Sequence, residues 1–127
     1  MAQEISVAAS LTYTNTANNI QSVSLAVKTP GLFTITGKVY ARELQTIPTT
    51  AGGTALKMGS ITTPGWGIFK NTDAVNYIEL LSAVSGTVFA RLKAGEIALL
   101  RLPPGMTAPA AIANTASVSL DYLILQD

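Results

Sequence analysis

The feature that most constrains this chain is a period of two in its hydrophobic residues. In the segment EISVAASLTYT, residues 4–14, one face is apolar: Ile5, Val7, Ala9, Leu11 and Tyr13. Successive side chains of a β-strand point to opposite faces, so this spacing predicts a half-buried strand. The same alternation appears in residues 22–28 and 32–41, and the Thr-Pro-Gly between these two segments is typical of a turn.

The middle of the chain has a different composition. Residues 46–65 are rich in Thr, Gly and Pro, which predicts a long loop with at most a short strand near residues 56–58. Within it, TAGGTAL lacks the Lys of a phosphate-binding loop and is interpreted as flexible linkage. Five short apolar segments follow, each bounded by turn residues: WGIFKN, NYIELLSA, TVFARLK, EIALLRL and ASVSLDYLILQ.

Two connections in this half carry their own predictions. Residues 93–96 are typical of a tight hairpin in which Gly95 takes the left-handed conformation. The Ala-rich segment MTAPAAIANT has room for one helical turn before Pro109 interferes. Eight or nine strands joined by Gly/Pro turns predict an all-β fold, an antiparallel β-sandwich or barrel with a jelly-roll-like topology. We expect one domain over residues 1–127.

Composition limits the partners. Charged residues make up 12% of the chain and hydrophobic residues 48%, so we expect neighbouring molecules to cover apolar surface in an oligomer or larger assembly. The eight basic residues are scattered, and the net charge is +1, which argues against nucleic acid as a partner. The first ten residues do not resemble a secretory signal, and no apolar run has the length of a membrane helix. We expect synthesis in the host cytoplasm and no membrane partner.

Catalytic side chains are scarce. The chain has no His and no Cys, which removes the usual general base, the common nucleophile pairs and most zinc sites. No motif pairs two carboxylates, so we expect neither enzymatic activity nor a cofactor. Asn71, Asp73 and Asn76 in NTDAVN are the nearest approach to a calcium site, but Asn and Asp between two strands are more typical of a turn.

Trp66 is the only tryptophan and lies between Gly65 and Gly67. If its strand alternates, Trp66 and Phe69 point to opposite faces, so one of these aromatics leaves the core. Trp66 then caps the core, contributes to a protein interface or stacks on a sugar ring, and the flanking glycines leave room for a close approach. Phe89 and Arg91 pose a similar choice between an interface rim and Arg packed over apolar surface.

The last 70 residues resemble a known group of proteins. The segments that carry the resemblance are GSITTPGWGIFKNTDAVNYIEL, RLKAGEIALLRLPPG and ANTASVSLDYLILQD. This set of segments is similar to small β-sandwich virion structural proteins of tailed bacteriophages. Its motifs are a Pro-Gly-aromatic strand, an Asn-x-Asp turn, an Asn-aromatic-Ile-Glu strand, a Leu-x-x-Gly-Glu hairpin and a Leu-x-Tyr strand. The N-terminal half matches only in being strand-like and rich in Thr.

The resemblance implies a capsid decoration (cement) protein, located on the outer capsid surface of the virion, that binds major capsid protein subunits or other virion proteins and stabilises the head. Such proteins are commonly homotrimers. A tail, connector or baseplate component is the alternative within this class. The alternative from another class is a carbohydrate-binding module, with Trp66 and Tyr77 stacking on sugar and Asp73 or Asn76 as hydrogen-bonding partners. Residues 1–5 and 46–59 are candidate clasps, and the candidate assembly contacts are Trp66, Phe89, Arg91, Ile5 and Leu56.

Overall fold

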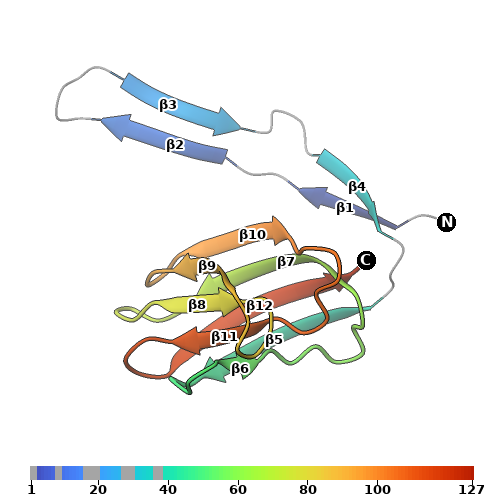
Figure 1. The fold of residues 1–127 in the computed structure, drawn as a ribbon. Coiled ribbons are helices and arrows are strands. Elements are labelled where there is room, and N and C mark those ends of the chain that lie inside the picture. The colour runs from blue at the N-terminus through green and yellow to red at the C-terminus, as the bar shows by residue number, and fades with distance from the viewer. Residues whose placement is uncertain (1–2, 8–9, 16–20, 27–30, 36–38) are drawn as a thin grey trace. The chain divides into compact units, whose positions relative to one another are not determined.

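The computed structural model describes residues 3–7, 10–15, 21–26, 31–35 and 39–127, and the chain divides into two compact units, Met1–Thr36 and Gly37–Asp127 (Figure 1). In the first unit, β1 (Gln3–Val7) pairs with β4 (Gly31–Ile35), and β2 (Ser10–Asn15) pairs with β3 (Gln21–Ala26). Both pairs are antiparallel. The single strand predicted over residues 4–14 corresponds to two strands, β1 and β2, in separate sheets, and residues 8 and 9 lie outside the described residues.

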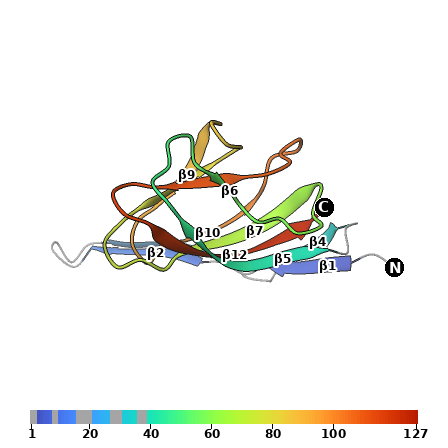
Figure 2. The ribbon, with the colours of Figure 1, turned by 90° about the horizontal axis from the view of Figure 1, so that it is seen from below.

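The second unit contains eight strands in two four-stranded antiparallel sheets. One sheet has the order β10-β7-β12-β5 and the other β6-β11-β8-β9. Figure 2 shows the first sheet as one layer, with β6 and β9 in the other. The strands are β5 (Tyr40–Ile47), β6 (Thr54–Ala55), β7 (Pro64–Asn71), β8 (Ile78–Leu81), β9 (Val88–Leu92), β10 (Ile97–Arg101), β11 (Ala110–Ala113) and β12 (Val118–Gln126).

The strand order is that of a jelly roll. Numbered from one to eight along this unit, the strands lie in the orders 6-3-8-1 and 2-7-4-5. The pairs β5·β12, β6·β11, β7·β10 and β8·β9 thus form four nested antiparallel ribbons wrapped into two layers. The predicted all-β, antiparallel, jelly-roll-like sandwich is confirmed, and the described residues form neither a closed barrel nor a helix. The single domain over residues 1–127 stays a prediction, whereas the sandwich is complete within Gly37–Asp127.

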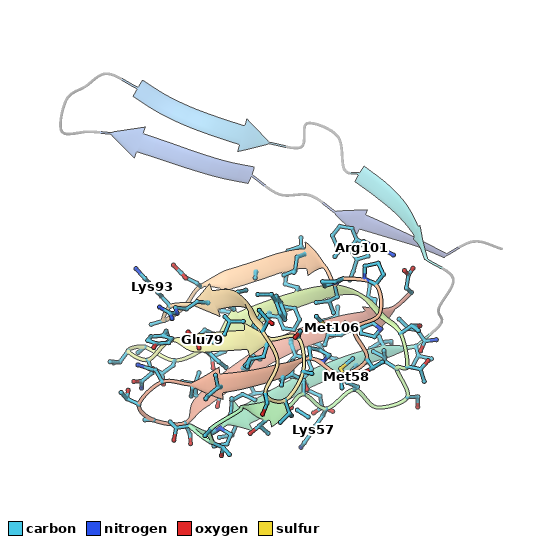
Figure 3. The ribbon with its side chains drawn as sticks, in the orientation of Figure 1. Lys57, Met58, Glu79, Lys93, Arg101 and Met106 are labelled. Carbon is cyan, nitrogen blue, oxygen red and sulfur yellow. The ribbon has the colours of Figure 1, made fainter. Side chains whose placement is uncertain are left out.

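The core lies between the two sheets and follows the period of two. On β12, Leu120, Tyr122 and Ile124 are buried, and on β7 the buried residues include Phe69. The rings of Phe69 and Tyr122 pack with centroids 6.3 Å apart. From the second sheet, Ile78 and Leu80 complete the same cluster, and Met106 lies in it with Met58 packed against it (Figure 3). Burying apolar side chains from both layers supplies the main driving force for folding.

The loop between β5 and β7 is more ordered than its composition predicts. Thr46 and Ile47 still belong to β5, and β6 lies two residues before the short strand that was expected at residues 56–58. The interpretation of residues 50–56 as flexible linkage is wrong. Gly53 N–H donates to Thr50 O at 2.9 Å, and Ser85 N–H donates to Gly52 O at 2.7 Å, so the glycines form a turn fixed against the loop after β8.

Three further predictions need correction. Gly95 does take a left-handed conformation, with φ of 76°, and Glu96 N–H donates to Lys93 O. However, this turn joins β9 in one sheet to β10 in the other, so it is a crossing between layers and no hairpin. The Ala-rich segment forms β11 instead of a helical turn, because its small side chains let it lie buried between β6 and β8. The strand expected over residues 32–41 is divided between β4 and β5.

Candidate interaction face

The side of the β10-β7-β12-β5 sheet that points away from the core is unusually apolar. An antiparallel sheet with one solvated face normally alternates apolar residues inside with polar residues outside. In three of its cross-strand rows, eight of twelve outward residues are apolar, and the next row, Thr46 and Ser119, is polar. We call these twelve residues the outer face, and its three cross-strand rows are Tyr40, Leu125, Trp66 and Arg101; Arg42, Leu123, Ile68 and Leu99; and Leu44, Asp121, Lys70 and Ile97.

The most exposed apolar side chains of the outer face lie on its two edge strands. Tyr40 and Leu44 on β5 are 65% and 66% exposed, and Ile97 on β10 is 57% exposed. On the central strands, Ile68 remains 38% exposed, while Leu123 and Leu125 are half-buried. Apolar residues contiguous over four strands form a patch of the kind that marks an interaction site, which single exposed residues do not.

Both arginines of the outer face form ion pairs within the chain, whereas Lys70 forms none with another described residue. Arg42 forms an ion pair with Asp121 on the neighbouring strand, and its Nη2 lies 3.2 Å from Asp121 Oδ2. This hydrogen bond to Asp121 raises the pKa of Arg42 above its ordinary value. Arg101, which is labelled in Figure 3, forms an ion pair with Asp127. Such exposed pairs contribute little to stability, but they reduce the net charge that a docking partner meets.

A hollow of about 200 Å³ lies within the outer face, lined by Arg42, Ile68, Lys70, Ile97, Asp121, Tyr122 and Leu123. Its lining thus combines the apolar residues Ile68, Ile97 and Leu123 with Lys70 and the Arg42–Asp121 ion pair. The volume matches one inserted side chain of a partner better than a drug-sized ligand, which needs about 300 Å³ or more.

Trp66 lies on the outer face and is half-buried. The predicted alternation of its strand is confirmed, because Gly67, Phe69 and Asn71 are buried while Ile68 and Lys70 are exposed. Its flanking glycines serve packing within the chain: a Cβ on Gly67 would stand 2.6 Å from the Phe69 ring, and one on Gly65 2.9 Å from Asp127. They therefore do not provide space for a ligand beside the indole.

Phe89 and Arg91 have different surroundings in the second sheet. The register shifts between Leu80 and Leu81 opposite β9, and Phe89 packs against the core. Arg91 points outward, where it forms an ion pair with Glu79 and lies over the ring of Tyr77, with its Cζ 4.6 Å from the ring centroid. Arg91 thus lies over apolar surface of its own chain, which is the second of the two interpretations left open by the sequence.

The other candidate contacts differ in what they offer a partner. Leu56 is only 4% exposed and donates its N–H to Pro109 O, so it belongs to the core and presents little surface. The backbone of Ile5 lies in β1 opposite Phe33, and its side chain is outside the described residues. The assembly roles of Trp66, Phe89, Arg91, Ile5 and Leu56 stay predictions.

The NTDAVN segment forms a hydrogen-bonded turn. Asp73 Oδ1 accepts from the backbone N–H groups of Val75 and Asn76 at 2.7 and 2.6 Å, and these bonds lower the pKa of Asp73. Asn71, fully buried, donates from Nδ2 to Asn76 O and Leu92 O and accepts from Asp73 N–H. Between residues 39 and 127 and in the N-terminal strands, no group of three or more acidic residues is placed to hold a metal ion.

Most residues of the outer face were not singled out in the sequence. Leu123 and Leu125 carry a signal, because the run YLIL in β12 is apolar at successive positions where a half-buried strand alternates. Such a run is typical of a strand covered on both faces. The same signal occurs in IALL of β10. Leu44 and Tyr40 gave no such signal, because their strand contains Arg42 and Glu43.

Comparisons with protein families, with curated proteins and with solved structures find no match for this chain. The resemblance to bacteriophage virion proteins is therefore carried by the quoted segments alone. In the described part of the chain, no helix has the length and apolar character needed to span a membrane.

Proposed function

We propose that this protein is a virion structural protein, specifically a capsid decoration protein that binds major capsid subunits and stabilises a bacteriophage head. The observation that carries the proposal is the outer face, a jelly-roll sheet surface that is apolar across four strands and has its arginines paired internally. A partner that covers this face removes its apolar area from water, which favours association. The resemblance of residues 59–127 to virion proteins favours a capsid as that partner.

The size of the outer face bears on how the protein is held. With strands about 4.8 Å apart and a rise of about 3.3 Å per residue, the three rows cover about 300 Å² in projection. A stable interface buries about 800 Å² on each partner, so this face alone is too small. Attachment to a capsid therefore requires additional contacts, for which residues 1–5 and 46–59 and further copies of the chain are candidates. Weak contacts repeated by symmetry add up to firm attachment.

The carbohydrate-binding alternative loses its proposed platform. Trp66 points outward from the β10-β7-β12-β5 sheet, whereas Tyr77 precedes β8 and stacks with Arg91 on the outer side of the other sheet. The two aromatics thus lie on opposite faces of the sandwich. Asp73 is engaged in its turn, and Asn76 Oδ1 accepts from the Thr115 hydroxyl at 2.6 Å. A sugar site would have to use Trp66 without these partners.

The proposal is tested on particles produced by the genome that encodes the chain, with and without its coding sequence. We expect particles that lack the protein to release DNA at a lower temperature and to resist chelator less well. Adding back the purified protein should restore both properties, which controls for assembly defects. Identical heat and chelator curves for the two kinds of particle would contradict a cementing role. Protein found only in detached tails would favour the tail or baseplate alternative.

A further inference from the structure

β10 forms one edge of its sheet and, within the described residues, pairs only with β7. Asn71 N–H donates to Glu96 O at 3.0 Å, and Leu102 N–H donates to Gly65 O at 2.7 Å. These two hydrogen bonds determine which residues of β10 direct their backbone N–H and C=O groups toward β7, because successive residues of an antiparallel strand direct these groups alternately to its two sides.

It follows that the backbone groups of Ala98 and Leu100 face β7. Those of Ile97, Leu99 and Arg101 face the open edge of the sheet. The side chains of Ile97 and Leu99 are 57% and 40% exposed beside this edge, so an approaching strand would meet apolar side chains as well as backbone donors and acceptors. Such an edge is a template for pairing with another strand.

The other three edges of the sandwich carry features that discourage pairing. β6 has only two residues, and β9 is opposite a register shift and contains the charged Arg91. β5 contains Arg42 and Glu43 within its length. Short strands, bulges and charges are the usual protections of edge strands. In β10, IALLR, the charge comes only at the last residue, so the open edge of β10 differs from the rest.

We propose that β10 joins two copies of this protein, by antiparallel pairing of β10 with β10 across a two-fold axis at Leu99. In this register Leu99 lies opposite Leu99 of the second copy, and Ile97 lies opposite Arg101. All the backbone groups that face the open edge are then used, since each of the three pairs exchanges two hydrogen bonds in an antiparallel ladder. The interface is self-complementary, as a two-fold contact requires.

Charge favours the second copy as occupant and selects this register. Arg101 faces an isoleucine across the axis, and its ion pair with Asp127 of its own chain compensates its charge. A register centred on Arg101 would place Arg101 directly opposite Arg101 of the second copy, and like charges in this position destabilise a pair of strands. The pairing also joins two outer faces into one continuous sheet surface of about 600 Å² in projection. This surface approaches the size that a stable interface needs on one partner.

The experiment is sedimentation of the purified full-length chain from micromolar to millimolar concentration. We expect twice the monomer mass of 13.2 kDa for the wild type. Leu99→Pro removes an N–H that faces the open edge and leaves the β7 ladder intact, so this variant should sediment as a folded monomer. Leu99→Lys should do the same by placing two cations opposite each other. Leu44→Lys is the matched control, because it adds the same charge to the same outer face on the opposite edge strand.

Hydrogen exchange gives an independent measurement. The amides of Ile97, Leu99 and Arg101 should be protected at high concentration and exchange quickly in the Leu99 variants, while the edge-facing amide of Leu44 exchanges quickly throughout. A wild type that stays monomeric, a trimer that persists in Leu99→Pro, or loss of the dimer in Leu44→Lys would each overturn the proposal. The measurement uses the isolated chain, so its outcome is separate from that of the capsid experiment.

Discussion

The hydroxyl oxygen of Tyr122 lies 2.9 Å from Gln45 Oε1 and 3.0 Å from Lys57 O, inside the sandwich. Gln45 in turn donates to Ala55 O and accepts from Lys57 N–H, both at 3.0 Å. One buried amide and one buried hydroxyl therefore fix the segment that follows β6 to the first sheet. Because this segment has few other backbone partners among the described residues, its order depends on two side chains from β5 and β12.

We predict that Tyr122→Phe lowers the free energy of unfolding by about 1–2 kcal/mol, since it leaves Lys57 O without its buried donor. Urea denaturation checks this value. Tyr77→Phe is the control, because that ring keeps its contact with Arg91 without the hydroxyl. Equal stability of Tyr122→Phe and the wild type would show that the hydroxyl is replaced by water.

Burial raises the pKa of Tyr122 from 10.0 to about 12. The folded state then holds a proton that the unfolded state loses, so this contribution to stability is complete below pH 10 and is lost as the pH rises to 12. We expect the wild type to lose stability over this range more steeply than Tyr122→Phe. Unfolding curves of both proteins at several alkaline pH values measure the difference, and parallel curves would contradict the prediction.

The contribution of Asp73 to stability has the opposite dependence on pH. Hydrogen bonds from the Asn76 and Val75 backbone lower the pKa of Asp73 below 3.8, so its contribution is complete above that pH and is lost as the pH falls through the folded-state value. We predict that Asp73→Ala is less stable than the wild type at neutral pH and that the difference shrinks in acid. Thermal melting at neutral and acidic pH tests this. Asp121→Ala, which removes a more exposed ion pair, should show a smaller loss at neutral pH.

Gly67 leaves space for the Phe69 ring, whose Cε2 and Cζ atoms would lie 2.6 and 2.7 Å from an added Cβ. We predict that Gly67→Ala costs about 1–3 kcal/mol by overpacking this part of the core. Phe69→Leu shortens the clashing side chain, so the double variant should lose less stability than the sum of the two single variants. Additive losses would show that the ring does not set the size of residue 67.

The sequence contained most of the local structure but little of the pairing. Alternation in WGIFKN predicted that Phe69 and Trp66 lie on opposite faces of β7, as they do, but it did not determine which of the two faces the core. The turn at Gly95 was predicted by its residue types, yet the partner of β10 was not, because a turn does not determine whether its two strands share a sheet. β11 was missed because alanine favours helices in isolation, whereas here tertiary packing selects it for its size.

The candidate site was predicted in part. Trp66 was identified because it is unique, and it does lie on the outer face. Its neighbours across the sheet, Leu125 and Arg101, come from strands far apart in the sequence. Their proximity depends on the jelly-roll order, which no local pattern encodes. Leu56 was chosen as part of a supposed loop, and the hydrogen bonds that draw it into the core could not be read from composition.

The central claim, that neighbouring molecules hold this protein through its outer face, is tested most directly by adding purified variants to particles that lack it. Ile68→Glu places a charge at the centre of the outer face, and Val88→Glu places one at an exposed position of the other sheet. After melting curves establish that both variants are folded, co-sedimentation measures their binding. We predict that the wild type and Val88→Glu sediment with the particles, whereas Ile68→Glu stays in the supernatant. Equal binding of Ile68→Glu and the wild type would contradict the account.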